Sequence, residues 1–114
     1  MDLDRYKAKI REFANERDWD QFHDPKNLSM ALSAEIGELL DIFQWLTSEQ
    51  SKNLPDNDLK LAKEELGDIM IYLIRLSDKL GIDLEEAIEE KLKINAEKYP
   101  VDLSRGNSTK YNKR

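Results

Sequence analysis

The stretch AEIGELLDIFQW, residues 34–45, has the apolar spacing of a helix but carries two glutamates beside its apolar face. Ile36 and Leu40 recur about one turn apart and share that face. The same winding places Glu35 and Glu38 at its margin, away from the fully solvated side. Ionised carboxylates beside apolar side chains are costly unless a cation or hydrogen bonds compensate. The stretch therefore predicts a helix whose two glutamates need a compensating positive charge nearby.

A second stretch, KEELGDIMIYL at residues 63–73, repeats the pattern. Glu65, Asp68 and Tyr72 fall on one edge of a helix at spacings of three and four. Spacing alone is weak evidence because the chain has 24 acidic residues, so the apolar surroundings distinguish these pairs. Lys or Arg can supply the positive charge through ordinary ion pairs. The alternative is Mg²⁺ or Mn²⁺ held by carboxylate oxygens.

Turn and capping residues divide the chain into four expected helices. Asp24 before Pro25 is a favourable helix start, Gly81 a favourable stop, and Pro100 ends the last helix. Asp83 and a glutamate three residues later fit a capping box. We expect the helices at residues 2–18, 25–47, 58–80 and 83–99, and we expect 48–57 to be a loop. The predicted fold class is all-α, a four-helix bundle.

The third expected helix is apolar around most of its circumference, with a narrow polar strip around Glu64 and Arg75. Such a helix needs neighbours on several sides, and a chain of 114 residues offers few. We therefore expect a homo-oligomer.

Composition excludes several classes of protein. The absence of Cys rules out disulfides and thiol catalysis, and a net charge of −6 argues against binding a nucleic acid polymer. No apolar run approaches the ~20 residues that span a bilayer, and the first residues do not resemble a signal peptide, so we expect no membrane association and a cytoplasmic location. A di-iron site of the Glu-x-x-His type is disfavoured because His23 is the only histidine.

The motifs at 34–45 and 64–73 resemble the paired Glu-x-x-Glu and Glu-x-x-Asp motifs of the MazG-like all-α nucleoside triphosphate pyrophosphohydrolases. The likeness continues through ERDWDQFHDPKNL (16–28) and KINAEKYPVDLSRGNSTKY (93–111), which resemble the small single-domain branch that includes dCTP pyrophosphatases. The resemblance implies a catalytic domain over 1–100. It also implies that the basic tail, 101–114, closes over the substrate phosphates; a frayed terminus is the alternative.

The resemblance implies Mg²⁺-dependent hydrolysis of a (deoxy)nucleoside triphosphate to the monophosphate and pyrophosphate, in nucleotide-pool control or housecleaning. It assigns Glu35, Glu38, Glu65 and Asp68 as metal ligands, with Mn²⁺ a possible substitute. Glu38 is our choice for the catalytic base, with Glu35 as its catalytic partner. The family pattern also implies a homotetramer built as a dimer of dimers.

The same resemblance assigns substrate contacts. Aromatic faces stack on a base with little selection. The nucleoside contacts are Trp19, Trp45, Tyr72 and His23. The phosphate and sugar contacts are Lys91, Asn95, Tyr99, Arg105, Lys110 and Tyr111. Core packing for the aromatic residues, and a solvated helix face for Lys91 and Asn95, are the alternatives.

One position departs from dCTP-selective relatives, which carry a base-facing histidine on the first helix where this chain has Ile10. Loss of an edge-reading hydrogen bond favours broad deoxynucleotide use, dCTP included, over strict dCTP selectivity. Two other functions remain open at this point. One is a non-catalytic helical dimerisation module, and the other is hydrolysis of a different phosphorylated metabolite.

Overall fold

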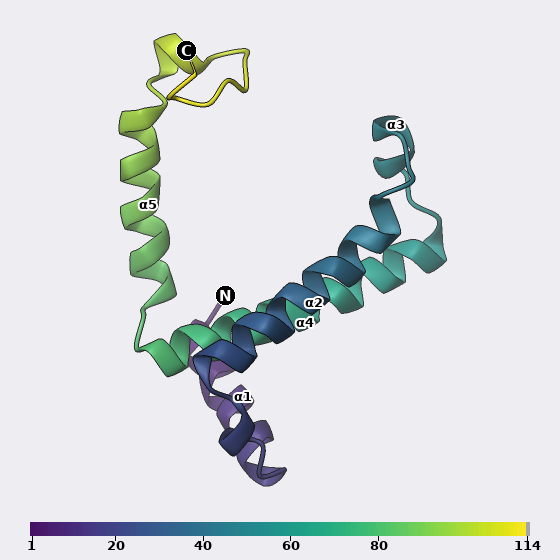
Figure 1. Ribbon diagram of the computed structural model, residues 1–114, viewed down its shortest axis with the longest axis vertical. Helices are drawn as coiled ribbons and strands as arrows, with labels where there is room; N and C mark the ends of the chain where they lie inside the picture. Colours follow the sequence, from purple (N-terminus) through teal and green to yellow (C-terminus); the bar gives the residue numbers. More distant parts are fainter. Residues whose placement is uncertain (114) are drawn as a thin grey trace. The chain divides into compact units, whose positions relative to one another are not determined.

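The computed structural model describes residues 1–113, and those residues form helices joined by short turns, without strands (Figure 1). The elements are α1 (Leu3–Glu16), a 3₁₀ turn η1 (Asp20–Phe22), α2 (Pro25–Phe43), α3 (Ser48–Ser51), α4 (Asp56–Leu80), α5 (Leu84–Lys98) and α6 (Val101–Ser104). The predicted all-α class is confirmed. The chain divides into two compact units, Met1–Gly81 and Ile82–Arg114.

The predicted helix boundaries follow from local capping. The Asp24 carboxylate accepts a hydrogen bond from the Asn27 amide at 2.7 Å, and a proline occupies the first turn of α2. Gly81 ends α4 with a φ of 67°, in the left-handed region that glycine adopts at low cost. Asp83 accepts from the Glu86 amide at 3.2 Å and so begins α5. These three expected boundaries are confirmed.

The segment expected to be a loop, 48–57, contains the short helix α3, and the tail contains α6. The Thr47 hydroxyl and the Gln50 amide group form a reciprocal capping box at the start of α3. The backbone of Thr47 is extended for that cap, so residue 47 is not helical, contrary to expectation, and α2 ends at Phe43. Helices of four residues are too short to show apolar periodicity, so the sequence pattern did not reveal them.

Within the first unit, α2 and α4 lie side by side and α1 packs against α4 (Figure 1). Among residues 1–113 the buried apolar core is small and consists of Ala14, Leu28, Ala62 and Ile74. Large apolar side chains on both long helices remain exposed, including Leu40 at 58% and Leu66 at 56%. The predicted bundle within a homo-oligomer stays a prediction. No helix in residues 1–113 is long and apolar enough to cross a membrane.

Arg75, which the sequence places in a narrow polar strip of α4, is buried among charged side chains. Its side chain is 4% exposed and its guanidinium lies 2.6 Å from the Asp20 carboxylate and 3.8 Å from that of Asp78. Arg11 of α1 donates to Asp78 at 2.6 Å and lowers the pKa of that carboxyl. Lys79 also pairs with Asp20. These ion pairs join α1 and η1 to α4.

We expect Asp78→Ala to lower the free energy of unfolding by about 2 kcal/mol, because the buried Arg75 and its neighbour Arg11 both lose an anion. Urea unfolding measures the change. The control is Glu49→Ala, which breaks a solvated pair with Lys52 and is expected to cost less than about 0.5 kcal/mol. Equal costs for the two variants would contradict the prediction.

Candidate active site

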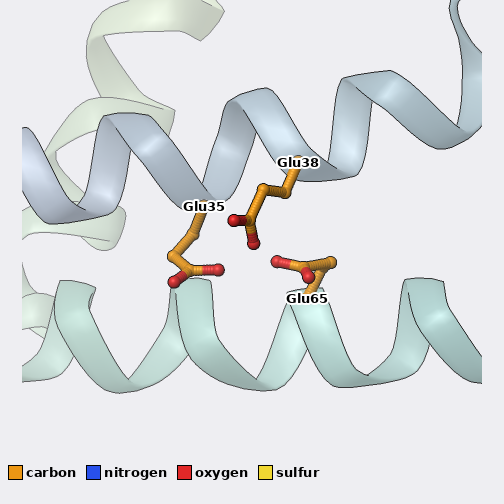
Figure 2. Close-up of side chains that lie close together, drawn as sticks. All are labelled: Glu35, Glu38 and Glu65. Atoms are coloured by element: carbon orange, nitrogen blue, oxygen red, sulfur yellow. The ribbon is translucent and has the colours of Figure 1, made fainter.

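Three carboxylates converge between α2 and α4. Glu35 and Glu38 come from α2, one turn apart, and Glu65 comes from α4. Figure 2 shows the three side chains pointing toward one another across the space between the helices. One oxygen from each group lies within 4.8 Å of one from each of the others. The two glutamates at the margin of the apolar face thus meet a third, as the sequence indicated.

Two of these carboxylates carry buried oxygens that have no hydrogen-bond partner, Oε2 of Glu35 and Oε2 of Glu65. A buried anionic oxygen without a partner is costly. Ordinary pairing with Lys or Arg does not account for these two atoms. A hard divalent cation is bound by oxygens converging in this way, so the cluster fits a metal ion.

The close approach of these carboxyl groups changes the titration of Glu35. The pKa of Glu35 is raised from 4.5 to about 7. The largest cause is the hydrogen bond with the Glu65 carboxyl, followed by burial and by the neighbouring carboxyls of Glu38 and Asp68. When Glu35 is protonated, its hydroxyl can donate a hydrogen bond to Glu65. When both are ionised, neither oxygen can donate and the like charges repel. Without a cation, the cluster therefore holds a proton near neutral pH.

This shift predicts how the stability of the metal-free protein depends on pH. The pKa of Glu35 is raised on folding, so its contribution is fully present below pH 4.5 and is lost as the pH rises to about 7. We expect this contribution to the free energy of unfolding in EDTA to fall across that window, whereas the lowered pKa of His23 gives a contribution of opposite sign below pH 6.5. The carboxyls of Asp20 and Asp78 have lowered pKa values, so their contributions stay constant there.

Urea unfolding at several pH values in this window checks the prediction. Glu35→Gln is the matched variant, because it keeps the shape of the side chain and removes the titrating proton. A slope unchanged in Glu35→Gln would show that other groups cause the pH dependence.

A cavity of about 250 Å³ lies in the same unit. Trp19, His23 and Tyr72 line it together with Ile10 and Asp68. The Trp19 ring packs edge-on against Phe13 at a centroid distance of 5.8 Å, and its centroid lies 6.4 Å from that of His23. Three of the four predicted nucleoside contacts therefore meet around one cavity.

Asp68 connects this cavity with the carboxylates. It lies one turn after Glu65 on α4, is exposed, and contributes to the raised pKa of Glu35. Its oxygens are not among the three that converge within 4.8 Å. Trp45 follows the end of α2, is 86% exposed and is not among the residues lining the cavity. The assigned roles of Asp68 and Trp45 stay predictions.

Comparison with known proteins identifies the family of the chain. The MazG-like family model matches residues 30–113, which include the carboxylate cluster and the tail. The chain belongs to the MazG-like family.

Individual relatives of this MazG-like chain include dCTP pyrophosphatase 1 of Mus musculus and of Bos taurus, at 44% and 45% identity over 102 residues. These alignments cover 88% of the chain, which spans only 60% of the length of either relative. A crystal structure of a pyrophosphatase from Archaeoglobus fulgidus is 36% identical, with a TM-score of 0.82. That alignment covers 88% of this chain and 94% of the other.

The residues predicted to contact phosphate lie in the second unit of this MazG-like chain. Lys91 is exposed and Asn95 half-buried on α5. Further along, the rings of Tyr99 and Tyr111 pack edge-on with centroids 6.0 Å apart. The Lys98 ammonium group lies 4.9 Å from the centre of the Tyr111 ring. The tail therefore folds back on the end of its own helix.

Two positively charged members of the predicted phosphate set, Arg105 and Lys110, are exposed in this tail. Their role as phosphate ligands stays a prediction. Arg114, at the end of the basic tail, lies outside the described residues.

Sequence reasoning missed two features of the site. Lys98 packs on Tyr111, which spacing along the chain does not reveal. Arg75 reaches the cavity lined by Trp19 and Tyr72 and bonds to His23, although periodicity placed it in a polar strip. Asp20, in the loop before α2, is the carboxylate that pairs with the buried Arg75. The two residues are 55 positions apart, so the sequence pattern did not reveal the pair.

Proposed function

We propose that this MazG-like protein hydrolyses (deoxy)nucleoside triphosphates to the monophosphate and pyrophosphate with Mg²⁺. The observation that carries the proposal is the convergence of Glu35, Glu38 and Glu65 with two buried, unpartnered oxygens. An aromatic cavity that shares Asp68 with the acidic motif supports it. Relatives named pyrophosphatases agree with this function.

The metal ligands in this proposal are Glu35, Glu38 and Glu65, with Asp68 as the fourth. Their oxygen-only donor set suits Mg²⁺, with Mn²⁺ as a substitute. When bound, the ion offsets the negative charge of the phosphates that opposes attack by water.

Glu38 is the residue we assign to the proton transfer. It is exposed, unlike Glu35 and Glu65, so water can reach its carboxylate. The carboxylate accepts a proton as the oxygen of water bonds to phosphorus, and the anhydride bond between the α- and β-phosphates breaks. Glu35 and Glu65 lie beside Glu38 and act as metal ligands in this proposal.

The substrate contacts in this proposal are those that the family resemblance assigns. Trp19 and Tyr72 stack on the base beside His23, and Trp45 adds a further aromatic surface. The residues of α5 and the tail bind the phosphates and sugar. We infer a domain over 1–100 followed by the closing tail, a homotetramer and a cytoplasmic location.

The test is a panel of dNTPs and NTPs incubated with the full chain and Mg²⁺, with separate detection of monophosphate, pyrophosphate and orthophosphate. We expect equimolar monophosphate and pyrophosphate, and turnover of several dNTPs including dCTP. Loss of turnover in EDTA and recovery with Mg²⁺ or Mn²⁺ test the metal.

Two results would overturn the proposal. Orthophosphate as the product would place the cleaved bond elsewhere. No turnover of any nucleotide, with phosphoribosyl-ATP as a further substrate, would favour either another metabolite or a non-catalytic helical module.

A further inference from the structure

The buried guanidinium group of Arg75 lies beside the base cavity and has no part in the proposed hydrolysis. Arg75 is 4% exposed and faces the loop between α1 and α2. Its Nη2 donates to the Asp20 carboxylate at 2.6 Å, and its Nε donates to Nδ1 of His23 at 3.2 Å. Both Arg75 and His23 line the cavity that also contains Trp19 and Tyr72.

The bond from Arg75 determines which nitrogen of His23 carries the proton. Arginine has donors only, so Nδ1 must accept with its lone pair. The proton of the neutral ring is then on Nε2. A flipped ring would place a C–H group against the guanidinium and lose the hydrogen bond. Burial, and then the charges of Arg75 and Lys79, lower the pKa of His23, which keeps the ring neutral near pH 7.

We infer that Arg75 is a positioning residue for base recognition: it holds His23 as the Nε2–H tautomer, so that the cavity presents one N–H donor of fixed identity to the nucleobase. The inference rests on the proposed nucleotide-hydrolysing function. The two nitrogens of an imidazole point to different sides of the ring, so Nε2 is turned away from Arg75. Trp19 and Tyr72 provide stacking that tolerates any base, and the N–H group adds a directional contact.

The ligand chemistry follows from the donor. A carbonyl oxygen or a ring nitrogen on the base edge accepts from Nε2–H, whereas an amino group at the same position meets a second donor and is disfavoured. The cavity of about 250 Å³ is smaller than the ~300–1,000 Å³ usual for drug-sized ligands, which suits one heterocycle. The cavity is therefore matched to a base that presents an acceptor.

The tautomer is measured directly in the nucleotide-free and metal-free full chain. His23 is the only histidine in the sequence, so long-range ¹H–¹⁵N correlation spectra report on it without assignment. We expect a protonated Nε2 and an unprotonated Nδ1 in the wild type, and a mixture of tautomers in Arg75→Met. A wild-type ring protonated on Nδ1, or an even mixture, overturns the inference. If Arg75→Met does not fold, the wild-type spectrum still decides.

The functional role is tested at His23. His23→Leu removes the donor, and His23→Gln keeps an amide N–H near the position of Nε2. With a dNTP whose base presents an acceptor, we expect His23→Leu to raise KM about five- to tenfold and to change kcat by less than about twofold. We expect His23→Gln to restore most of the KM.

Unchanged KM in His23→Leu overturns the recognition role. Failure of the inference is distinguishable from failure of the proposed function. Absence of nucleotide hydrolysis in the wild type removes the proposed function and base recognition together, while the tautomer is judged separately from the spectra.

Discussion

Glu38→Gln is expected to lower kcat for dNTP hydrolysis by about 10²- to 10³-fold. The amide keeps the size of the side chain but cannot accept the proton of water and is a weaker ligand for a cation. Glu38 is the exposed member of the three-carboxylate cluster, so the substitution leaves the buried packing of α2 unchanged. Steady-state kinetics with saturating Mg²⁺ measure the effect.

The matched control is Glu64→Gln. Glu64 precedes Glu65 on α4, is exposed, and is not part of the converging cluster. Glu64→Gln makes the same change of charge on the neighbouring helix, so we expect its kcat to remain within about twofold of wild type. Full activity in Glu38→Gln would remove the site assignment, and an equal loss in both variants would show a general effect of charge.

The thermal stability of Glu38→Gln separates catalysis from folding. Removing one of several like charges relieves repulsion, so the metal-free variant is expected to be at least as stable as the wild type. A lowered midpoint in EDTA would instead attribute the loss of kcat to unfolding.

The long helices could be predicted from the sequence because their signals are local. Asp24 with Pro25, and Gly81, determine where α2 begins and α4 ends through contacts with residues a few positions away. The short helix α3 could not be predicted, because four residues show no period. The reciprocal bonds of Thr47 and Gln50 were visible only as a spacing that many segments share.

The site was partly predictable for a related reason. Glu35, Glu38 and Glu65 were detected because charge beside an apolar face is anomalous on a single helix, whatever its partner. The pairing of Arg75 with His23 was not detected, because its members are 52 positions apart and each is ordinary in its own segment. A charge beside an apolar face can be recognised within one segment, whereas a contact between distant segments becomes visible only in the structure.

The effect of Glu65→Gln on stability is expected to have opposite signs with and without metal. In EDTA above pH 7, where the Glu35 carboxyl is ionised, the variant should unfold at a higher urea concentration than the wild type, because the Gln amide can donate to the unpartnered Oε2 of Glu35. The variant also removes the carboxyl whose hydrogen bond is the largest cause of the raised pKa of Glu35. Urea unfolding in EDTA measures this gain.

With Mn²⁺ or Mg²⁺ present, the order of stability should reverse. A ligand that binds only the folded state stabilises it by about 2.7 kcal/mol at a concentration of one hundred times Kd. Loss of one carboxylate ligand should weaken metal binding at least about tenfold in calorimetric titration, so the same metal concentration stabilises Glu65→Gln about 1.4 kcal/mol less. Glu64→Gln is again the control and should respond to metal as the wild type does.

This reversal distinguishes a metal ligand from a structural carboxylate. A carboxylate held by protein groups stabilises the fold in both conditions, so its replacement would lower stability with and without metal. A carboxylate positioned for a cation destabilises the empty protein and stabilises the loaded one. The two buried oxygens without a hydrogen-bond partner destabilise the empty protein and are available to bind a cation. A loss of stability in Glu65→Gln under both conditions would therefore contradict the metal site.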